Sequence, residues 1–277
     1  MSGEGGRGRA PTPADPAEIK QCCARLYESE IVRVLLGESF HPGGTALTER
    51  LGVLLGLSSD SVVLDAASGN GTSALFLAER FGCRVIGVDL GADNVARAMA
   101  DARRSGVADR VQFRVGDAEQ LPLSDSAFDA VVCECAFCTF PDKATAANEF
   151  ARVLKSGGRL GLSDLPRAPG PPGELSDLMA WVACLADARP AASYLEWLTG
   201  AGMQDAVVEH HDEALIDMIK GIGTRLFATE VLAGLGKVDL AGIDLAAAKR
   251  LTRDAMRAVT EHRLGYVIVC ATKHDGG

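Results

Sequence analysis

The strongest constraint on this chain is a regular alternation of short apolar runs with longer amphipathic segments across residues 57–166. Five runs are almost continuously apolar or β-branched: VVLDA, CRVIGVDL, VQFRVGD, FDAVVCE and RLGLSDL. Such runs are typical of parallel strands that are buried on both faces of a sheet. The segments between them have the periodicity of helices, and several end at a glycine. The alternation therefore predicts an α/β fold, with helices on both faces of a mostly parallel sheet.

The regions outside this alternation predict how the rest of the chain is organised. Residues 1–17 are rich in glycine, proline and arginine and are expected to form a disordered tail. Residues 18–56 carry two helical patterns and are expected to form an N-terminal helical lid over the core at 57–166. Residues 167–277 contain two more strand-like runs, AVVEHHD and YVIVCATK, separated by a helical insert. These two runs would complete a Rossmann-like sheet of seven strands.

Composition excludes two classes of partner. The 277 residues carry a formal net charge of −9, which argues against a nucleic-acid surface because phosphates require a basic patch. No uninterrupted run of about eighteen apolar residues occurs, so no membrane span is expected. The first residues lack the apolar region of a signal peptide, so we expect a cytoplasmic protein. In that compartment the eight cysteines are expected to be free thiols rather than a disulfide framework.

A glycine-containing loop follows the first predicted strand and indicates a nucleotide-type ligand. Asp65 ends the strand, and Ala67, Gly69 and Gly71 follow it in the sequence DAASGNGT. The glycines let the backbone pass close to a ligand at the N-terminus of the next helix. The same spacing also satisfies the dinucleotide pattern, so NAD is an alternative ligand. A carboxylate at Asp65 would repel a pyrophosphate but would suit an amine.

Two further carboxylates follow neighbouring strands. Asp89 ends the second predicted strand and precedes Leu90, about twenty residues after the loop, where a carboxylate can bind ribose hydroxyls. Asp117, which Ala118 follows, comes after the third predicted strand and could contact the edge of an adenine. Because ligands bind at the carboxyl ends of the strands in such sheets, these side chains are expected to line one site.

Four segments in this order resemble the class I S-adenosylmethionine-dependent methyltransferases: VVLDAASGNGT, VIGVDLG, GDAEQLPLSDSAFDAVV and RVLKSGGRLGLSDL. The resemblance covers residues 51–165. It implies that S-adenosylmethionine is the cofactor, that the glycine loop holds its methionine part, and that Asp89 binds its ribose. Ala67 stands where the family has a glycine, which is tolerable if the φ angle of Ala67 is negative. The predicted cofactor-binding set is Asp65, Ala67, Gly69, Gly71, Asp89, Leu90, Asp117, Ala118 and Glu134.

Cysteines cluster after the fourth predicted strand, in the sequence CECAFC. Cys135 and Cys138 are expected at the mouth of the site because they follow the carboxyl end of that strand. Cys133 would share a face with Cys135 if the strand continued. A Cys-x-x-Cys pair can be a redox motif, but here it does not open a helix in a thioredoxin context. Together with Cys22 and Cys23, the same pair could instead hold a structural zinc ion.

A second resemblance addresses the methyl acceptor. The runs ECAFCTFPDK and WVACLADARPAASYLEWLTGAGM are similar to the arsenite methyltransferases. This implies that Cys135 and Cys184 hold trivalent arsenic as thiolates, with a third thiol from Cys22 or Cys23. Soft thiolates suit a thiophilic centre, whose lone pair can attack a sulfonium methyl group without a general base. The predicted arsenic-binding set is Cys22, Cys23, Cys135, Cys138 and Cys184, and residues 167–277 are expected to cover this acceptor site.

Two alternative functions remain open. The first is a small-molecule O- or C-methyltransferase of the ubiquinone-biosynthesis type, in which His41, or His210 or His211 of the sixth predicted strand, lies near the acceptor. The second is an NAD-dependent oxidoreductase. The expected partner is a small molecule or a metalloid, with a thiol reductant if arsenite is the substrate.

Overall fold

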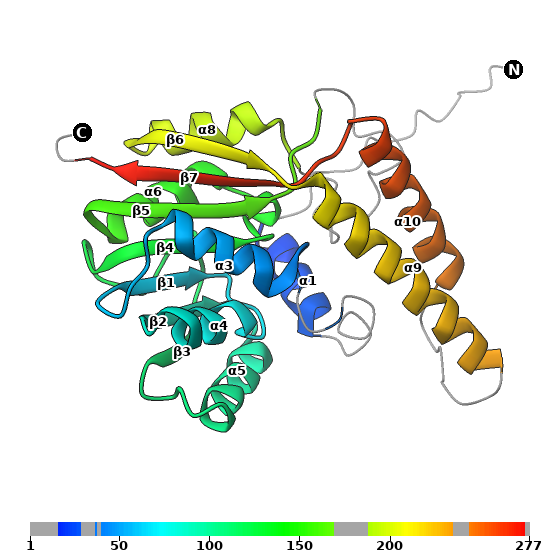
Figure 1. Cartoon of the computed structure of the whole chain (residues 1–277), viewed down its shortest axis with the longest axis horizontal. Coiled ribbons are helices and arrows are strands. Elements are labelled where there is room, and N and C mark those ends of the chain that lie inside the picture. The colour runs from blue at the N-terminus through cyan, green and yellow to red at the C-terminus, as the bar shows by residue number, and fades with distance from the viewer. Residues whose placement is uncertain (1–15, 29–36, 38–39, 169–187, 235–243, 275–277) are drawn as a thin grey trace, which may run out of the picture.

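The computed structural model describes residues 16–28, 37, 40–168, 188–234 and 244–274. Its centre is one sheet of seven strands in the order β3-β2-β1-β4-β5-β7-β6 (Figure 1). The strands are β1 (Val62–Ala66), β2 (Arg84–Asp89), β3 (Val111–Val115), β4 (Phe128–Glu134), β5 (Leu154–Asp164), β6 (Met203–His210) and β7 (Val267–Lys273). Strands β1 to β5 are parallel to one another, whereas β7 runs antiparallel to both β5 and β6. The predicted Rossmann-like, mostly parallel sheet is confirmed.

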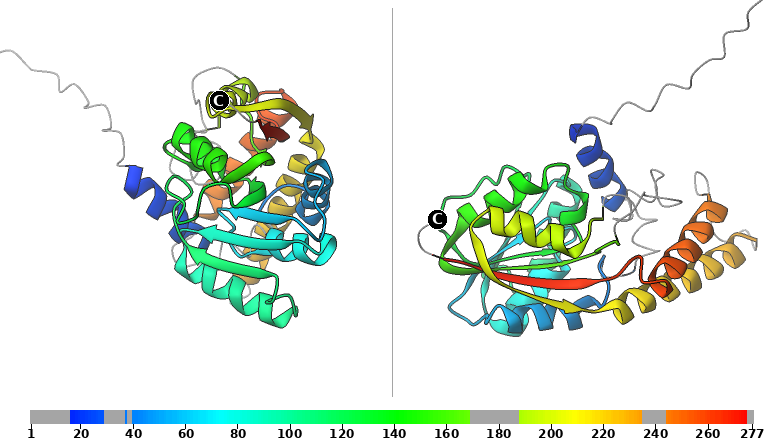
Figure 2. Two further views of the ribbon diagram at one scale, coloured as in Figure 1. Left: turned by 90° about the vertical axis from the view of Figure 1, so that its left-hand side faces the viewer. Right: turned by 90° about the horizontal axis from the view of Figure 1, so that it is seen from above.

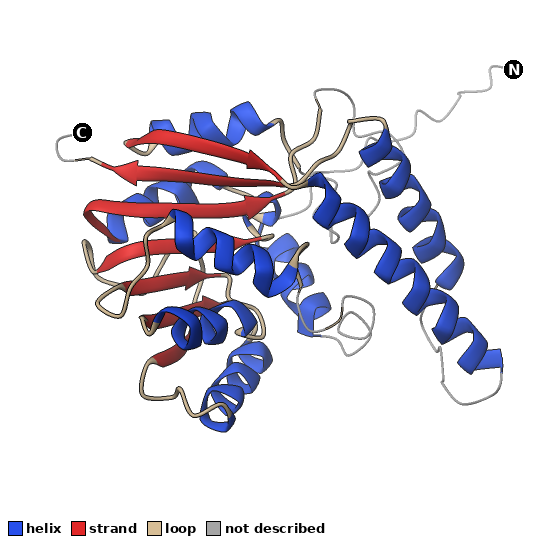
Figure 3. Cartoon of the chain, viewed as in Figure 1, coloured by secondary structure: helices blue, strands red, loops and turns tan. Residues whose placement is uncertain are grey.

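Helices cover both faces of this sheet, as Figure 3 shows. One face packs against α3 (Gly44–Leu54), α4 (Thr72–Phe81) and α5 (Ala92–Arg104), and the other against α6 (Lys143–Val153) and α8 (Ala191–Gly200). Leu51 and Leu77 are fully buried on the first face, and Phe150 and Tyr194 on the second. Because apolar side chains fill both faces, the strands read as continuous apolar runs in the sequence.

The remaining helices lie beyond the carboxyl ends of the parallel strands. Helix α1 (Pro16–Glu28) lies near the ends of β1 and β4, and a short 3₁₀ turn at Phe137–Thr139 follows β4. Helices α9 (Asp212–Gly234) and α10 (Leu245–Thr260) connect β6 to β7 and pack side by side, extending past the sheet (Figure 2). These helices and their neighbours bury a third apolar cluster next to the strand ends.

The boundary between α6 and β5 differs from the sequence-based expectation. The pattern KATAANEFARVLKSGG predicts a helix through Gly158, but α6 ends at Val153 and β5 begins at Leu154. Leu154 is fully buried and pairs with Phe128 of β4, so it belongs to the sheet rather than to the helix. Gly157 has a φ of 72°, a left-handed conformation that a helix does not contain.

Two other expected helices fall partly outside the described residues. The N-terminal helix predicted for residues 18–36 is described only as far as Glu28. The helix predicted from the segment LSDLMAWVACLADA lies almost entirely within residues 169–187, which are not described. Across the described part of the chain, no helix is both long and apolar enough to cross a membrane.

Candidate active site

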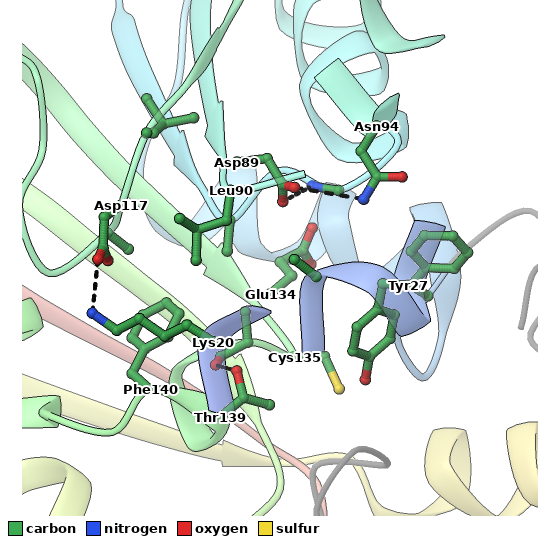
Figure 4. Close-up of a pocket in the computed structure, with 18 residues that line it drawn as sticks. Lys20, Tyr27, Asp89, Leu90, Asn94, Asp117, Glu134, Cys135, Thr139 and Phe140 are labelled. Atoms are coloured by element: carbon green, nitrogen blue, oxygen red, sulfur yellow. Dashed lines mark hydrogen bonds and ion pairs between the residues drawn. The ribbon is translucent and has the colours of Figure 1, made fainter. Parts of the chain in front are cut away.

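A pocket opens at the carboxyl ends of β1, β2, β3 and β4, where ligands of such sheets bind (Figure 4). Seven residues of the predicted cofactor set and one of the predicted thiols line it together: Ala67, Gly69, Asp89, Leu90, Asp117, Ala118, Glu134 and Cys135. Asp65 and Gly71 do not line this pocket. The structure therefore brings most of the sequence-predicted positions to one place, although they come from four strands.

Asp89 fixes the shape of the pocket through its carboxylate. Oδ2 accepts a hydrogen bond of 2.8 Å from the backbone N–H of Gly69, and Oδ1 accepts one of 2.8 Å from Gly91. Asn94 Nδ2 lies 3.5 Å from the same Oδ1. Burial raises the pKa of Asp89, and these hydrogen bonds act in the opposite direction. One carboxylate thus joins the glycine loop after β1 to the loop after β2.

The glycine loop shows two features that the sequence does not reveal. Ala67 has a φ of 58°, so the condition under which an alanine would be readily tolerated here, a negative φ, is not met. Gly71 has a φ of 82°, and an added Cβ would lie 2.6 Å from Phe113 Cζ and 2.8 Å from Ala98 Cβ. The glycine at 71 is therefore required by packing beneath the loop. At Gly69 (φ 52°) an added Cβ would meet only Phe40, at 3.5 Å, on the pocket side.

Asp65 provides a test of whether the site suits the cofactor. Asp65 is 2% exposed, and its Oδ2 atom has no hydrogen-bond partner. Burial raises the pKa of Asp65 well above its usual value, and the negative charges of Glu134 and Asp89 raise it further. Three carboxylates around one small region favour a ligand that brings positive charge. S-adenosylmethionine carries an ammonium and a sulfonium group, so the residues present fit this cofactor.

Helix α1 forms one wall of the pocket. The sequence predicts a helical lid here but does not predict which of its residues line the pocket. Lys20, Ala24 and Tyr27 line the pocket from this helix (Figure 4). Lys20 Nζ lies 2.7 Å from Asp117 Oδ2 and 2.5 Å from Glu119 Oε2. The helix is therefore attached to the carboxylate that was predicted to contact adenine. A lysine in an amphipathic helix gives no signal of such a partner, since most lysines of this kind are solvated.

Glu134 is the centre of a buried polar network at the end of β4. Its side chain is 3% exposed. It accepts hydrogen bonds from Thr48 Oγ1 (3.0 Å), Ser73 Oγ (2.5 Å) and Ser163 Oγ (3.4 Å). These hydroxyls come from α3, α4 and β5 respectively. Because buried polar groups need hydrogen-bond partners, the convergence of three donors satisfies the oxygens of this side chain beside the pocket.

His41 joins this network from the other side. Its Nε2 lies 3.6 Å from Glu134 Oε2 and 3.4 Å from both Thr48 Oγ1 and Ser73 Oγ, and the side chain is 6% exposed. Its Nδ1 lies 3.2 Å from the carbonyl oxygen of Pro42. We assign the proton of the neutral ring to Nδ1, because a carbonyl can only accept a hydrogen bond. This assignment leaves Nε2 as the basic atom, on the side of Glu134.

A separate groove of about 910 Å³ begins at His41. It runs between the segment before α3 and the N-terminal half of α9. Its lining residues are Gly37, His41, Gly43, Ala46, Leu47, His210, His211, Asp212, Glu213, Ala214, Asp217, Met218, Gly221 and Arg225. All three histidines that the sequence analysis singled out therefore border it. His41 contacts Glu134, which lines the cofactor pocket, so the pair lies between the two hollows.

The structure describes the side chains of only two of the five predicted thiols. Cys135, with a φ of 53°, lines the cofactor pocket, whereas Cys138 is 1% exposed and packs in the apolar cluster under α9 and α10. Cys184 lies outside the described residues, and so do the side chains of Cys22 and Cys23. Among the described residues, no three His, Cys, Asp or Glu side chains are arranged to hold a metal ion. The arsenic and zinc hypotheses therefore rest on side chains that the structure does not describe.

Comparison with known proteins identifies the family. Residues 64–162 match the methyltransferase domain family. The chain is 30% identical to 27-O-demethylrifamycin SV methyltransferase of Amycolatopsis mediterranei (strain S699), over 96% of this chain and 99% of that protein. It is 29% identical to an arsenite methyltransferase of Halobacterium salinarum, over 57% of this chain and only 41% of that protein.

The fold is also similar to that of solved methyltransferases. Phosphoethanolamine N-methyltransferase 2 of Haemonchus contortus, solved with phosphomonomethylethanolamine and S-adenosylhomocysteine, aligns with a TM-score of 0.79 at 18% identity. The alignment covers 93% of this chain and 60% of that one. The cofactor is thus S-adenosylmethionine, and the NAD-dependent alternative is set aside. The chain belongs to the S-adenosylmethionine-dependent methyltransferases that act on small molecules.

Proposed function

We propose that this protein transfers the methyl group to a hydroxyl oxygen of a small organic acceptor. The observation that carries the proposal is the buried His41–Glu134 pair between the cofactor pocket and the groove. An oxygen nucleophile at neutral pH needs a base, and histidine is the side chain that most often supplies one. The acceptor would lie in the groove, with its hydroxyl at His41.

Within the cofactor pocket we infer a division of roles among the predicted residues. Asp89 would bind the ribose, Asp117 and Ala118 would contact the adenine, and the backbone at Gly69 would hold the methionine part. Asp65, close beneath the loop, would compensate positive charge. When bound, S-adenosylmethionine supplies an electrophilic methyl group on a sulfonium sulfur.

The protein's own residues then manage one proton. Nε2 of His41 would take the proton that the acceptor hydroxyl loses when its oxygen is methylated, and the cofactor would leave as S-adenosylhomocysteine. The resulting imidazolium lies 3.6 Å from Glu134 Oε2, which stabilises its charge. The Pro42 carbonyl keeps the ring oriented by accepting from Nδ1. The three hydroxyls on Glu134 keep its carboxylate in place during this step.

The similarity to the rifamycin enzyme supports this proposal, because its name describes methylation at an oxygen and the match spans almost all of both chains. The test supplies methyl-labelled cofactor with catechol, 1,4-naphthohydroquinone and arsenite in parallel. We expect label on oxygen, at rates that Cys135→Ser leaves largely unchanged. Label transferred only to arsenic, or no transfer to any hydroxyl compound, would contradict the proposal.

Methylation of trivalent arsenic is the second candidate. The position of Cys135 in the cofactor pocket, beside Glu134, favours it, since a thiolate there could hold a thiophilic atom near the methyl group. It requires further thiols from Cys22, Cys23 or Cys184, and a thiol reductant as a partner. In the same assay, this function predicts that Cys135→Ser and Cys184→Ser each abolish transfer to arsenite while S-adenosylhomocysteine binding is retained.

A further inference from the structure

Tyr266 is a fully buried tyrosine that lies directly before β7 and borders neither the cofactor pocket nor the groove. Its hydroxyl donates a hydrogen bond of 3.0 Å to Ser163 Oγ on β5. The Ser163 hydroxyl in turn donates to Glu134 Oε1 at 3.4 Å. Ser163 and Glu134 are also register partners in the pairing of β4 with β5. A continuous chain of donors thus runs from Tyr266 to the carboxylate beside His41.

The direction of this chain is fixed by what each group can do. A carboxylate only accepts, so the Ser163 hydroxyl must donate to Glu134 and must receive its own hydrogen bond from Tyr266. Burial raises the pKa of Tyr266 well above its usual value, and the negative charges of Cys135 and Glu134 raise it further. The phenol therefore keeps its proton and stays a donor across the pH range of enzymes.

The charged groups around Glu134 make each hydrogen-bond donor to its carboxylate important. The titratable groups around Glu134, Ser163 and Tyr266 are His41 before α3, Asp65 of β1, Cys133 and Cys135 of β4, Asp164 of β5, and Asp212 of α9. Asp212 Oδ1 accepts a hydrogen bond of 2.9 Å from the backbone N–H of Tyr266. The carboxylates in this set disfavour another negative charge, and only His41 can offer a positive one. The charge of Glu134 consequently depends on hydroxyl donors, of which Ser163 is one of three.

We propose that Tyr266 is a positioning residue for methyl transfer, which orients the Ser163 hydroxyl toward Glu134 and so fixes the carboxylate that faces His41. The inference rests on the proposed function, in which His41 takes the acceptor's proton. Without the phenol hydroxyl, Ser163 Oγ is free to rotate away from Glu134. Hydrogen bonds in such chains strengthen one another. Removing the Tyr266 hydroxyl therefore also weakens the hydrogen bond from Ser163 to the Glu134 carboxylate.

The chain itself offers a matched control. Tyr194 is also fully buried, and its hydroxyl also donates a hydrogen bond of 3.0 Å, but to the backbone carbonyl of Leu165. Tyr266→Phe and Tyr194→Phe therefore remove the same atom from equally buried sites. A purely structural role predicts similar effects of the two substitutions on stability and activity, whereas a positioning role separates them.

The first measurement needs no acceptor. The His41 ring is followed by NMR in protein labelled with ¹³C at histidine Cε1, and its signal is assigned by its disappearance in His41→Asn. We expect Tyr266→Phe to move the midpoint of the His41 titration to lower pH, because a less firmly held carboxylate stabilises the imidazolium less. Tyr194→Phe is expected to leave the midpoint in place. Equal behaviour of the two variants would overturn the inference.

The second measurement separates this inference from the proposed function. The assay uses the hydroxyl compound of the panel above that accepts the label. With this acceptor, Tyr266→Phe should lower kcat by roughly three- to tenfold while the Kd for S-adenosylhomocysteine stays unchanged. Tyr194→Phe should retain kcat. If His41→Asn proves fully active, the proposed function fails. If His41→Asn is inactive but Tyr266→Phe matches Tyr194→Phe, only the role of Tyr266 fails.

Discussion

The two sides of the active site are built on different principles. On the cofactor side, the pocket residues that the sequence predicts stand at or shortly after the end of a parallel strand, as Ala67, Asp89 and Asp117 do, and α1 adds a further wall. On the proposed acceptor side, His41 and Thr48 lie seven residues apart, and the fold brings them together with Ser163 and Tyr266, which lie more than a hundred residues further along the chain. The first arrangement is local in sequence and suits a cofactor shared by a whole family. The second is long-range, and it is where an acceptor-specific chemistry can vary without changing the sheet.

The largest effect is expected from substitutions of the two glycines in the loop after β1, one of which should impair folding and the other cofactor binding. Gly71→Val should prevent folding or destabilise the protein by more than about 3 kcal/mol, since its Cβ would overlap Phe113 and Ala98. Gly69→Val should fold with a smaller loss, because only Phe40 lies near, yet should lose cofactor binding. Thermal unfolding and calorimetry with S-adenosylhomocysteine measure both. Equal stability of the two variants would show that the loop packs differently from the structure described.

Asp89→Ala should weaken cofactor binding by about 1–3 kcal/mol, because it removes a carboxylate that organises two loops. The expected stability loss is about 1–2 kcal/mol, from the unpaired N–H groups of Gly69 and Gly91. Titration calorimetry and thermal unfolding test the two numbers. An unchanged affinity for S-adenosylhomocysteine would remove Asp89 from the cofactor site.

Asp65→Asn should stabilise the ligand-free protein but weaken its binding of the cofactor. Because burial raises the pKa of Asp65 in the folded protein, its charge opposes folding once the pH exceeds the unfolded value. At pH 7 the ligand-free variant should therefore be more stable than the wild type by about 1–3 kcal/mol. The gain should shrink as pH falls and Asp65 becomes protonated. The same variant should bind S-adenosylmethionine more weakly, and a pH-independent gain in melting temperature would refute this account.

Lys20→Met is expected to have the smallest effect. Its bridges to Asp117 and Glu119 are partly exposed to solvent, so their loss should cost at most about 1 kcal/mol of stability. Since α1 would be less firmly attached, S-adenosylhomocysteine should dissociate a few times faster in stopped-flow measurements. Lys249→Met, which removes a comparable bridge to Glu230 between α9 and α10, is the control. Identical dissociation rates of S-adenosylhomocysteine in both variants would show that the attachment of α1 does not control release of the cofactor product.

Sequence reasoning predicted the cofactor side well because the strand ends are marked by carboxylates and glycines. It could not predict the positive φ of Ala67, which depends on how the whole loop is held. Nor could it place β5 at Leu154, since that residue continues the apolar pattern of α6 and only its pairing with Phe128 assigns it to the sheet.

The acceptor side was largely hidden from the sequence. His41 was recognised as a candidate, but without a partner, and Glu134 was assigned only to the cofactor. Thr48, Ser73 and Ser163 are ordinary hydroxyl residues whose role arises from their convergence. One signal was available: Glu134 ends the buried run FDAVVCE, and a carboxylate at the end of such a strand must find donors somewhere in the fold.

The most direct test of this account is a double-mutant cycle between His41→Asn and Glu134→Gln. If the two side chains act as one proton-accepting unit, each single variant should lower kcat by roughly a hundredfold, and the double variant by little more than either. The Kd for S-adenosylhomocysteine should change by less than about threefold in His41→Asn. Multiplicative losses in kcat, or full activity of His41→Asn, would contradict the claim that this pair performs the acceptor chemistry.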